Sequence, residues 1–260
     1  MQETEWIVKK VPEGVRPDPG CDLPFILRIL LAQRGFLADD QLETFLRPRL
    51  GDLRDPFELP EMDPAVQRIL QAVDKGEQTC IFGDYDVDGI TSVVILRHLL
   101  SAYGLDPQTF IPIRGREGYG LSDAAIDRCL DAGARPSLLI TVDCGTASGT
   151  QIKRLSEQGI DVIVVDHHET GLVGRPPAVA VVNPKLGDDY GYLCSAGVVF
   201  KLAHALLKTR RLQEVDLKEW LDLVAVATVA DIVPLVEENR LLVRHGLRRL
   251  PQTLNHGLRA

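Results

Sequence analysis

The chain has 260 residues, of which 45% are hydrophobic and 25% are charged, and its formal net charge is −8 at pH 7. These values are typical of globular proteins, and the length allows one large α/β domain with an accessory segment. The acidic balance is opposite to the basic footprint of most nucleic-acid-binding proteins. We therefore expect phosphate binding only at local basic patches or at bound cations.

Nothing in the sequence indicates export or a membrane span. The first six residues have neither the basic nor the apolar region of a secretion signal, and the longest apolar stretch, residues 221–236, contains two Asp residues and a Pro. The cysteines are odd in number and lack the paired spacing of a zinc site, so we expect reduced thiols in the core. They are Cys21, Cys80, Cys129, Cys144 and Cys194. We expect a cytoplasmic monomer without a membrane partner.

Helical patterns come first along the chain. Residues 22–34 and 62–75 have helical apolar spacing, and a Pro-rich turn near Asp55-Pro56 lies between them. From residue 76 onward, short apolar runs alternate with helical patterns. Strands are predicted at 78–83, 108–113, 138–143, 160–166 and 178–182. Helices are predicted at 89–103, 122–132, 147–158, 195–209, 216–228 and 238–250.

This alternation predicts an α/β fold with a doubly wound, mostly parallel sheet that is flanked by helices. The runs at 137–142 and 161–165 are nearly continuous β-rich segments, as in strands buried on both faces. Ser122 is expected to cap the helix that follows it. We expect an N-terminal helical segment, residues 1–75, and an α/β domain, residues 76–260, with ligands bound at the carboxyl ends of the strands.

Four short segments rich in Asp and His follow or interrupt the apolar runs. They contain Asp84, Asp86 and Asp88; Asp143; Asp166, His167 and His168; and Asp231. Gathered at one edge of a sheet, these groups would repel one another and lose hydration unless a cation neutralised them. Carboxylates and imidazoles without thiolates suit Mn²⁺, Mg²⁺ or Zn²⁺. Several carboxylates in one pocket indicate two ions and the hydrolysis of a phosphate ester.

Each of these residues also has a simpler structural explanation. An Asp after a strand is often a helix N-cap or a turn former, and Asp88-Gly89 is a common turn sequence. A His pair on its own is more often structural than a set of ligands. It is the combination of four segments that favours a metal site.

The same segments resemble a known family. Asp166-His167-His168 is similar to the signature of the DHH phosphoesterases, and residues 83–92 (GDYDVDGITS) resemble the first motif of the RecJ-type single-strand exonucleases. The similarity runs in the family's order over residues 20–260. It includes residues 114–121 (RGREGYGL), 183–185, 195–201, 230–235 (ADIVPL) and 238–240. RecJ-type proteins continue into a DHH-associated domain and an OB-fold, so the resemblance implies an N-terminal catalytic-core fragment that lacks these domains.

One position departs from the wider family. Many DHH pyrophosphatases and small-nucleotide phosphodiesterases have a His four residues before the second Asp of the first motif, where this chain has Phe82. The additional Asp84 of the RecJ branch is the expected substitute ligand.

The resemblance, together with the chemistry, assigns a role to each group. Two Mn²⁺ or Mg²⁺ ions are expected, with Asp143 as the bridging ligand. Asp88, His167 and Asp231 would complete one coordination shell, and Asp84 and Asp86 would hold the second ion. Because neighbouring side chains seldom point the same way, His168 is expected to contact a phosphate oxygen or assist proton transfer. Asp166 is expected to orient an imidazole from outside the coordination shell.

Further residues are expected to contact the substrate. Gly89 would leave room for a phosphate at the start of a helix, and Arg114 and Arg116 lie in a Gly-rich loop where they would clamp adjacent phosphates. Tyr119 either stacks on a base or packs as a loop aromatic. Two further basic groups, residues 208–211 and the Arg residues of 240–249, are also candidate phosphate-binding patches. The second group equally suits the solvated face of a helix, because Arg240, Arg244 and Arg248 recur every four residues.

The resemblance implies a metal-dependent exonuclease that digests single-stranded DNA from 5′ to 3′ in recombination and repair, with a single-strand-binding protein and a helicase as partners. Two alternatives remain open. One is a DHH phosphodiesterase acting on small nucleotides or very short oligonucleotides. The other is a non-catalytic scaffold that binds DNA or partner proteins.

Overall fold

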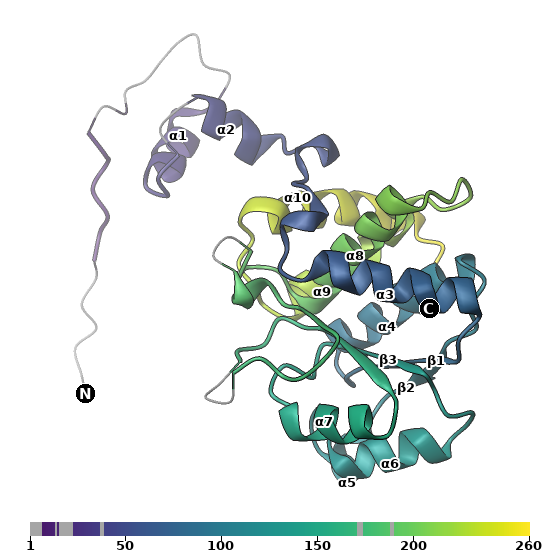
Figure 1. Cartoon of the computed structure of the whole chain (residues 1–260). Coiled ribbons are helices and arrows are strands. Elements are labelled where there is room, and N and C mark those ends of the chain that lie inside the picture. The colour runs from purple at the N-terminus through teal and green to yellow at the C-terminus, as the bar shows by residue number, and fades with distance from the viewer. Residues whose placement is uncertain (1–6, 14, 16–22, 37–38, 171–173, 188–189) are drawn as a thin grey trace, which may run out of the picture. The chain divides into compact units, whose positions relative to one another are not determined.

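A computed structural model describes residues 7–13, 15, 23–36, 39–170, 174–187 and 190–260 (Figure 1). The chain forms two compact units, Met1–Gly51 and Asp52–Ala260. Helix α3 (Met62–Lys75) packs on strand β5 (Ala180–Val182) and helix α8 (Ser195–Thr209), which places α3 in the larger unit. This unit therefore begins before residue 76, the predicted start of the α/β domain.

The N-terminal unit contains two short helices, α1 (Phe25–Ala32) and α2 (Asp39–Leu46). The predicted helix at 22–34 is confirmed as the shorter α1, and its first predicted residue lies outside the described part. Helix α2 was not predicted. The rings of Phe36 and Phe45, which flank the link between the helices, have centroids 4.2 Å apart.

The larger unit is built on a five-stranded parallel sheet with the order β2-β1-β3-β4-β5. The remaining strands are β1 (Thr79–Phe82), β2 (Gln108–Phe110), β3 (Leu138–Val142) and β4 (Asp161–Val165). All five predicted strands and the parallel, doubly wound sheet are confirmed. Every residue of β3 is buried, as expected of a strand covered on both faces.

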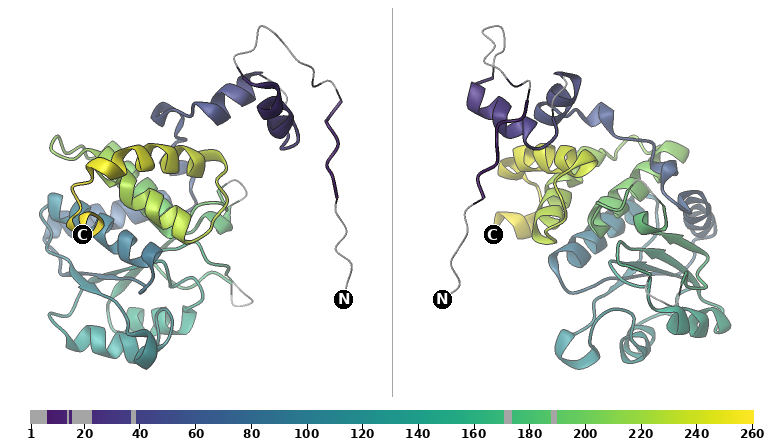
Figure 2. Two further views of the ribbon diagram at one scale, coloured as in Figure 1. Left: turned by 180° about the vertical axis from the view of Figure 1, so that it is seen from behind. Right: turned by 90° about the vertical axis from the view of Figure 1, so that its left-hand side faces the viewer.

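Helices cover both faces of the sheet (Figures 1 and 2). One face carries α6 (Asp123–Asp131) and α7 (Gly149–Glu157), whose apolar residues join those of β1 and β4 in one core cluster. The other face carries α3, α4 (Val87–Ala102), α8 and α9 (Leu221–Ala230), and α10 (Glu237–Arg249) packs against α9. Two very short helices, α5 (Arg114–Glu117) and α11 (His256–Arg259), complete the α-helices of the described residues.

Short 3-10 turns link several of these elements. They are Leu50–Asp52, Pro56–Glu58, Pro184–Leu186, Leu217–Trp220 and Leu250–Gln252. The 3-10 turn at 217–220 takes the first part of the helix predicted at 216–228. The predicted cap at the start of α6 is confirmed, because the Ser122 hydroxyl accepts a hydrogen bond from the amide of Ala125.

The thiols behave as predicted where the structure describes them. Cys80, Cys129, Cys144 and Cys194 are all free and buried, and Cys21 lies outside the described residues. Within the described part of the chain, no helix combines the length and the apolar character that crossing a bilayer requires.

Helices α9 and α10 approach closely at Gly246. A Cβ atom at this position would lie 2.0 Å from the carbonyl oxygen of Leu221 and 2.4 Å from the Cβ of Ala225. The contact helps to position Asp231, because Asp231 lies in the loop between α9 and α10.

Replacing Gly246 tests this packing. We expect Gly246→Ala to lower the free energy of unfolding by about 1–3 kcal/mol, because the added methyl group must push α9 and α10 apart. Gly115→Ala is the matched control, since a Cβ there meets no atom within 4 Å. Urea unfolding of both variants measures the effect. A Gly246→Ala variant as stable as the parent would contradict the close contact.

Candidate metal centre

Three neighbouring strands end in an Asp at the same edge of the sheet. Asp143 directly follows β3, Asp166 directly follows β4, and Asp84 lies two residues beyond the end of β1. The register pairs the last residues of β3 and β4, so Asp143 and Asp166 leave the sheet side by side. The sheet therefore brings the first three acidic segments together, as predicted.

Three groups of possible metal ligands result, each with its ligand atoms within 4.8 Å of one another. They are Asp84, Asp86 and Asp143; Asp143, His167 and His168; and Asp88, His167 and Asp231. Asp143 and His167 each belong to two groups. Asp143 is therefore shared between the group with Asp84 and Asp86 and the group with the two imidazoles; that it bridges two ions stays a prediction.

His167 lies at the centre of the second and third groups. Its Nε2 atom is 3.5 Å from Oδ1 of Asp143, 3.8 Å from Oδ2 of Asp88 and 3.7 Å from Oδ2 of Asp231. Asp231 comes from the turn after α9, far from the other segments in sequence. The imidazole therefore faces three carboxylates from three different elements.

Asp143 has an unusual backbone and an unusual carboxyl group. Its φ of 61° is in the left-handed region, which Asp tolerates better than most residues. The side chain is buried and its Oδ1 atom has no hydrogen-bond donor. Burial, and then the negative charges of Asp88 and Asp86, raise the pKa of Asp143 to about 10. Such a group is stable as a carboxylate only when a cation is close to it.

Asp88 is held by the start of α8. The backbone amide of Ser195 donates to its Oδ2 at 2.7 Å and that of Ala196 donates to its Oδ1 at 2.8 Å. Burial raises the pKa of Asp88, whereas these hydrogen bonds favour the charged form. The positive end of the 15-residue helix α8 also favours a carboxylate at this point. Asp88 is thus fixed in position before any ligand binds.

Asp84 and Asp86 have different surroundings. Asp84 is buried, its Oδ1 atom has no donor, and burial raises its pKa. Asp86 is exposed and caps α4, accepting a hydrogen bond from the amide of Gly89 at 2.9 Å. Phe82 packs into the core with its ring 5.0 Å from that of Phe110. The position that holds a His in many DHH phosphoesterases therefore offers no ligand here, and Asp84 is the nearby acid.

The donor set fits a divalent cation. Buried polar atoms normally have hydrogen-bond partners, yet one carboxylate oxygen of Asp84 and one of Asp143 have none in the described structure. Both belong to the same group of possible ligands. Oxygen ligands with a neighbouring imidazole suit Mn²⁺ or Mg²⁺.

Asp166 contacts His168, which is one of the two imidazoles that it is expected to orient. Its Oδ1 atom lies 2.7 Å from Nδ1 of His168, and its carboxylate accepts hydrogen bonds from the amides of Thr146, His167 and His168. Burial would raise the pKa of Asp166, but the contacts with His168 and Thr146 hold it at about 2. The other ring nitrogen of His168, Nε2, lies 2.8 Å from the hydroxyl of Tyr119.

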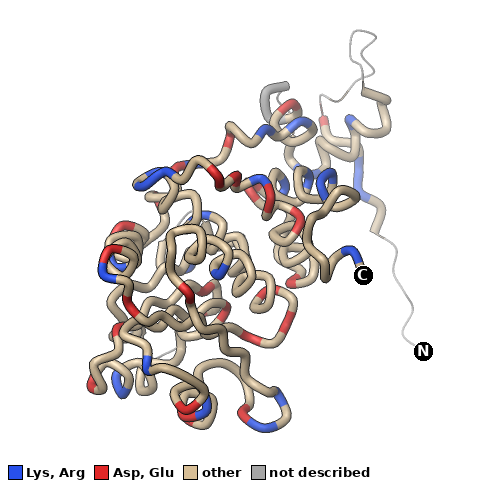
Figure 3. Tube along the Cα trace, turned by 90° about the vertical axis from the view of Figure 1, so that its right-hand side faces the viewer, with Lys and Arg blue, Asp and Glu red and all other residues tan. Residues whose placement is uncertain are grey.

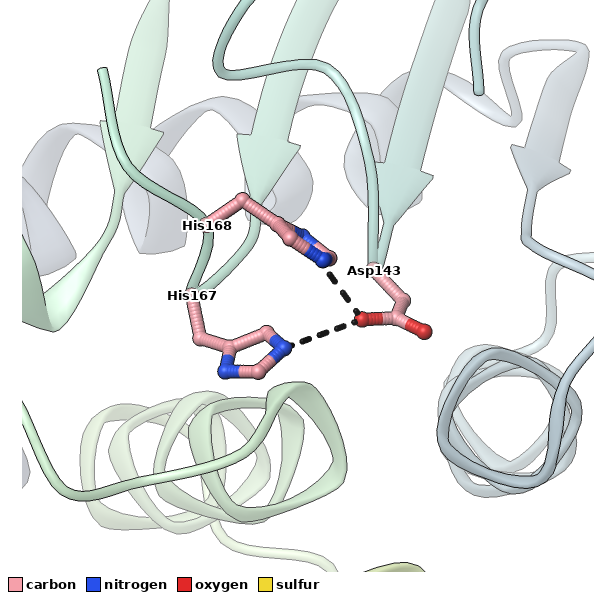
Figure 4. A group of neighbouring side chains, drawn as sticks. All are labelled: Asp143, His167 and His168. Carbon is pink, nitrogen blue, oxygen red and sulfur yellow. Dashed lines mark ion pairs between the residues drawn. The ribbon is translucent and has the colours of Figure 1, made fainter. Parts of the chain in front are cut away.

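The prediction that His167 and His168 point in different directions is wrong. Both imidazoles face the carboxylate of Asp143, and their ring centroids are 4.5 Å apart (Figure 4). The reason is local. Asp166 accepts hydrogen bonds from both backbone amides that follow it, which curls the chain and removes the alternation of an extended strand.

Gly89 has a different structural reason from the predicted one. A Cβ at this position would lie 2.6 Å from the carbonyl oxygen of Asp84. The space expected for a phosphate is therefore filled by the chain itself, and the amide of Gly89 already donates to Asp86. Helix α4 also begins two residues earlier, at Val87.

Arg114 and Arg116 lie on the short helix α5 rather than in an irregular loop. Both side chains are exposed, and the guanidinium carbon of Arg114 lies 5.3 Å from the centre of the Tyr85 ring. The rings of Tyr119 and Tyr85 meet edge to face, with their centroids 6.5 Å apart. Among the described residues, neither Arg forms an ion pair. They remain candidates for binding phosphate.

The helix α5 is itself well anchored. Glu117 accepts a hydrogen bond from the amide of Ile113 and forms an ion pair with Arg128. These partners hold the pKa of Glu117 at about 2. The two exposed Arg side chains therefore extend from a fixed turn.

The basic group at 208–211 is largely neutralised. Lys208 pairs with Asp55 at 2.5 Å and Arg210 pairs with Asp74 at 2.7 Å. Basic and acidic residues are interspersed along the described part of the trace (Figure 3). This distribution favours a local phosphate site over a broad basic surface.

The structure adds supporting residues that the sequence reasoning missed. Asn183 is buried and donates from Nδ2 to the Thr146 hydroxyl and to the carbonyl of His168, both at 2.9 Å. The amides of Ser195 and Ala196 hold Asp88. Asn183 and the two amides lie in segments that resemble the RecJ-type exonucleases. The sequence gives no role to them, because a backbone amide or a buried Asn has no chemical pattern of its own.

Comparison with known proteins defines the class. Residues 78–228 match the model of the DHH family, N-terminal domain. The match covers more than half of the chain and includes all five strands of the sheet, so the chain belongs to the DHH family.

The similar proteins within this family are named as exonucleases. Over 233 residues the chain is 42% identical to the single-stranded-DNA-specific exonuclease RecJ of Bacillus subtilis, covering 88% of this chain and 28% of that protein. It is 41% identical to the RecJ of Thermus thermophilus over 215 residues, covering 81% of this chain and 31% of that protein. The chain thus spans less than half the length of these relatives.

Solved structures show the same fold. One structure of exonuclease RecJ bound to manganese matches with a TM-score of 0.71 and 38% identity, covering 81% of this chain and 52% of that one. RecJ of Thermus thermophilus in complex with Mn²⁺ matches with a TM-score of 0.72 and 35% identity, covering 88% of this chain and 32% of that one.

Substituting Asp143 tests the electrostatics of the site without metal. Its pKa is about 10 in the folded chain against an ordinary value of 3.8, so ionisation of Asp143 opposes folding. The parent should therefore lose stability relative to Asp143→Asn as the pH rises from about 4 towards about 10. Asn removes the charge and tolerates the left-handed backbone.

Urea unfolding of both proteins across this pH range, with a chelator present, measures the difference. Mn²⁺ should then raise the unfolding temperature of the parent and not that of Asp143→Asn. A stability difference that stays constant with pH would contradict the burial of an ionisable Asp143.

Proposed function

We propose that this chain is the catalytic core of an exonuclease that hydrolyses single-stranded DNA with two Mn²⁺ or Mg²⁺ ions. The observation that carries the proposal is the set of three ligand groups joined through Asp143 and His167. The names of the relatives, single-stranded-DNA-specific exonucleases, support the substrate. The solved RecJ structures with Mn²⁺ support the metal.

The groups support a role for each ligand. Asp143 would be shared by the two ions, and Asp84 and Asp86 would hold one of them. Asp88, His167 and Asp231 would hold the other. Bound divalent ions would lower the pKa of a water molecule and neutralise the charge that develops at phosphorus.

His168 contacts the substrate in this proposal. It is fixed from one side by Asp166 and from the other by the Tyr119 hydroxyl, yet 43% of its side chain remains exposed. The hydrogen bond to Asp166 raises its pKa, which favours the protonated ring. A protonated imidazole would donate from Nε2 to a non-bridging phosphate oxygen, which would take the place of the Tyr119 hydroxyl.

Arg114 and Arg116 bind phosphates of the DNA strand in this proposal. They are exposed and unpaired in the described structure, and Arg114 stacks on Tyr85, which stands between the ligands Asp84 and Asp86 in the sequence. The stacking holds the guanidinium group near the centre while leaving its N–H groups available.

The 5′-to-3′ direction, a role in recombination and repair in the cytoplasm, and partnership with a single-strand-binding protein and a helicase also belong to the proposal. They rest on the resemblance to the RecJ-type exonucleases.

Digestion of end-labelled strands tests the proposal. With Mn²⁺ present, a 5′-labelled single strand should release its label as short products from the start, whereas a 3′-labelled strand should shorten progressively. Hydrolysis confined to dinucleotides or cyclic dinucleotides would favour the small-nucleotide phosphodiesterase. Mn²⁺ binding without any hydrolysis would favour the non-catalytic scaffold.

The two exposed Arg residues give a second test. We expect Arg114→Ala/Arg116→Ala to weaken single-strand binding and to flatten its dependence on salt by roughly 1.4 in log–log slope, at about 0.7 per phosphate contact. Hydrolysis of a minimal phosphodiester should change little. Fluorescence anisotropy at several salt concentrations measures the binding.

Lys75→Ala/Lys153→Ala is the matched control, because it removes the same charge from the exposed faces of α3 and α7. An equal loss on the long strand and on the minimal substrate would place Arg114 and Arg116 in the catalytic machinery instead.

A further inference from the structure

The loop that carries Asp231 has a strained backbone. It connects α9 to α10, and two non-glycine residues at its ends, Ile232 and Glu237, have φ of 58° and 42°. A β-branched residue in the left-handed region is a genuine outlier and persists only where its surroundings hold it. The side chain of Ile232 is 88% exposed, so its own packing does not hold the loop. Another group must do so.

Asn239 supplies a side-chain restraint on this loop. It lies in the first turn of α10 and is fully buried. Its Nδ2 atom donates to the carbonyl of Pro234 at 3.0 Å and to the carbonyl of Tyr192 at 2.5 Å. An amide nitrogen has two N–H donors, and both are used. One side chain thus ties the Asp231 loop to the segment around Tyr192.

That segment supports another predicted ligand. Three residues after Tyr192, the chain enters α8, whose first amides, those of Ser195 and Ala196, hold Asp88. Asp88 and Asp231 face the same Nε2 atom of His167 from 3.8 and 3.7 Å. Asn239 therefore links the segment that holds Asp88 to the loop that carries Asp231. These are the two carboxylates that flank His167.

The first turn of α10, which carries Asn239, is held firmly against α8. Glu238 forms a buried ion pair with Lys201 of α8 at 2.8 Å, and also accepts a hydrogen bond from the amide of Arg54 at 2.9 Å. The ammonium group of Lys201 donates in addition to the carbonyl of Arg54. These bonds fix α10 against α8, so that Asn239 acts from a defined position.

We propose that Asn239 is a positioning residue that sets the separation of Asp231 from Asp88 and His167, and thereby the affinity of the metal shell that these three form. The inference rests on the proposed function, since it requires that shell to bind a metal. The side-chain hydrogen bonds of Asn239 go to backbone carbonyls, so it acts through the loop rather than on the metal.

Mn²⁺ binding to Asn239→Asp, measured by isothermal titration calorimetry on the 260-residue chain, tests the proposal. The substitution keeps the shape of the side chain and removes at least one of the two donated hydrogen bonds, because a carboxyl group has at most one O–H to donate. We expect Mn²⁺ affinity to fall about 10- to 100-fold, as is typical when a residue that orients a ligand is lost. Ile126→Val is the control, because Ile126 is buried in α6 on the other face of the sheet. It should reduce stability without changing Mn²⁺ affinity.

A second variant separates positioning from general destabilisation. Ile232→Gly removes the backbone strain in the same loop, so the loop needs less restraint. Adding it to Asn239→Asp should recover at least threefold in Mn²⁺ affinity. Circular dichroism shows whether Asn239→Asp alone folds. If it does not, the double variant is compared with Ile232→Gly, and the double variant should bind Mn²⁺ at least threefold more weakly than Ile232→Gly does.

The possible failures are distinguishable. If the parent chain does not bind Mn²⁺, the metal site of the proposed function is wrong. If the parent binds and Asn239→Asp binds equally well, or if Ile126→Val weakens binding to the same extent, the positioning role is overturned and the metal site stands.

Discussion

The burial of carboxylates at one edge of the sheet is the constraint on which the structure depends. Four of them, Asp84, Asp88, Asp143 and Asp166, are almost inaccessible to solvent, and uncompensated negative charge in such a place strongly disfavours the folded state. The protein compensates two of the four. Asp88 receives the amides at the start of α8, and Asp166 receives three backbone amides and an imidazole. The other two each retain an oxygen atom without a donor.

Several elements of the larger unit hold or position the acidic residues at this edge of the sheet. The α8 amides hold Asp88, and the α9–α10 pair, packed closely at Gly246, presents Asp231 to the same imidazole. The buried Lys201–Glu238 pair fixes α10 to α8. The uncompensated oxygens of Asp84 and Asp143 then define where positive charge is missing. A net charge of −8 is compatible with binding an anionic strand, because bound cations would supply that charge locally.

Much of this could be predicted from the sequence, for identifiable reasons. Buried parallel strands are continuous apolar runs, so β3 and β4 were located to within a residue or two, and acids that follow parallel strands meet at one edge. The rest depends on tertiary contacts without a local pattern. The direction of His168 depends on how Asp166 captures two amides, and the need for Gly89 depends on the approach of the Asp84 carbonyl. Likewise, the buried amide of Asn239 acquires meaning only when α8 and α10 are placed together.

A crystal of the chain grown with Mn²⁺ tests the central claim most directly. The anomalous difference map should show two peaks roughly 3.5–4 Å apart, the spacing of two-metal sites, with the carboxylate of Asp143 between them. One peak should be bound by Asp88, His167 and Asp231, and the other by Asp84 and Asp86. The absence of peaks at this edge of the sheet, or peaks that do not contact Asp143, would contradict the account.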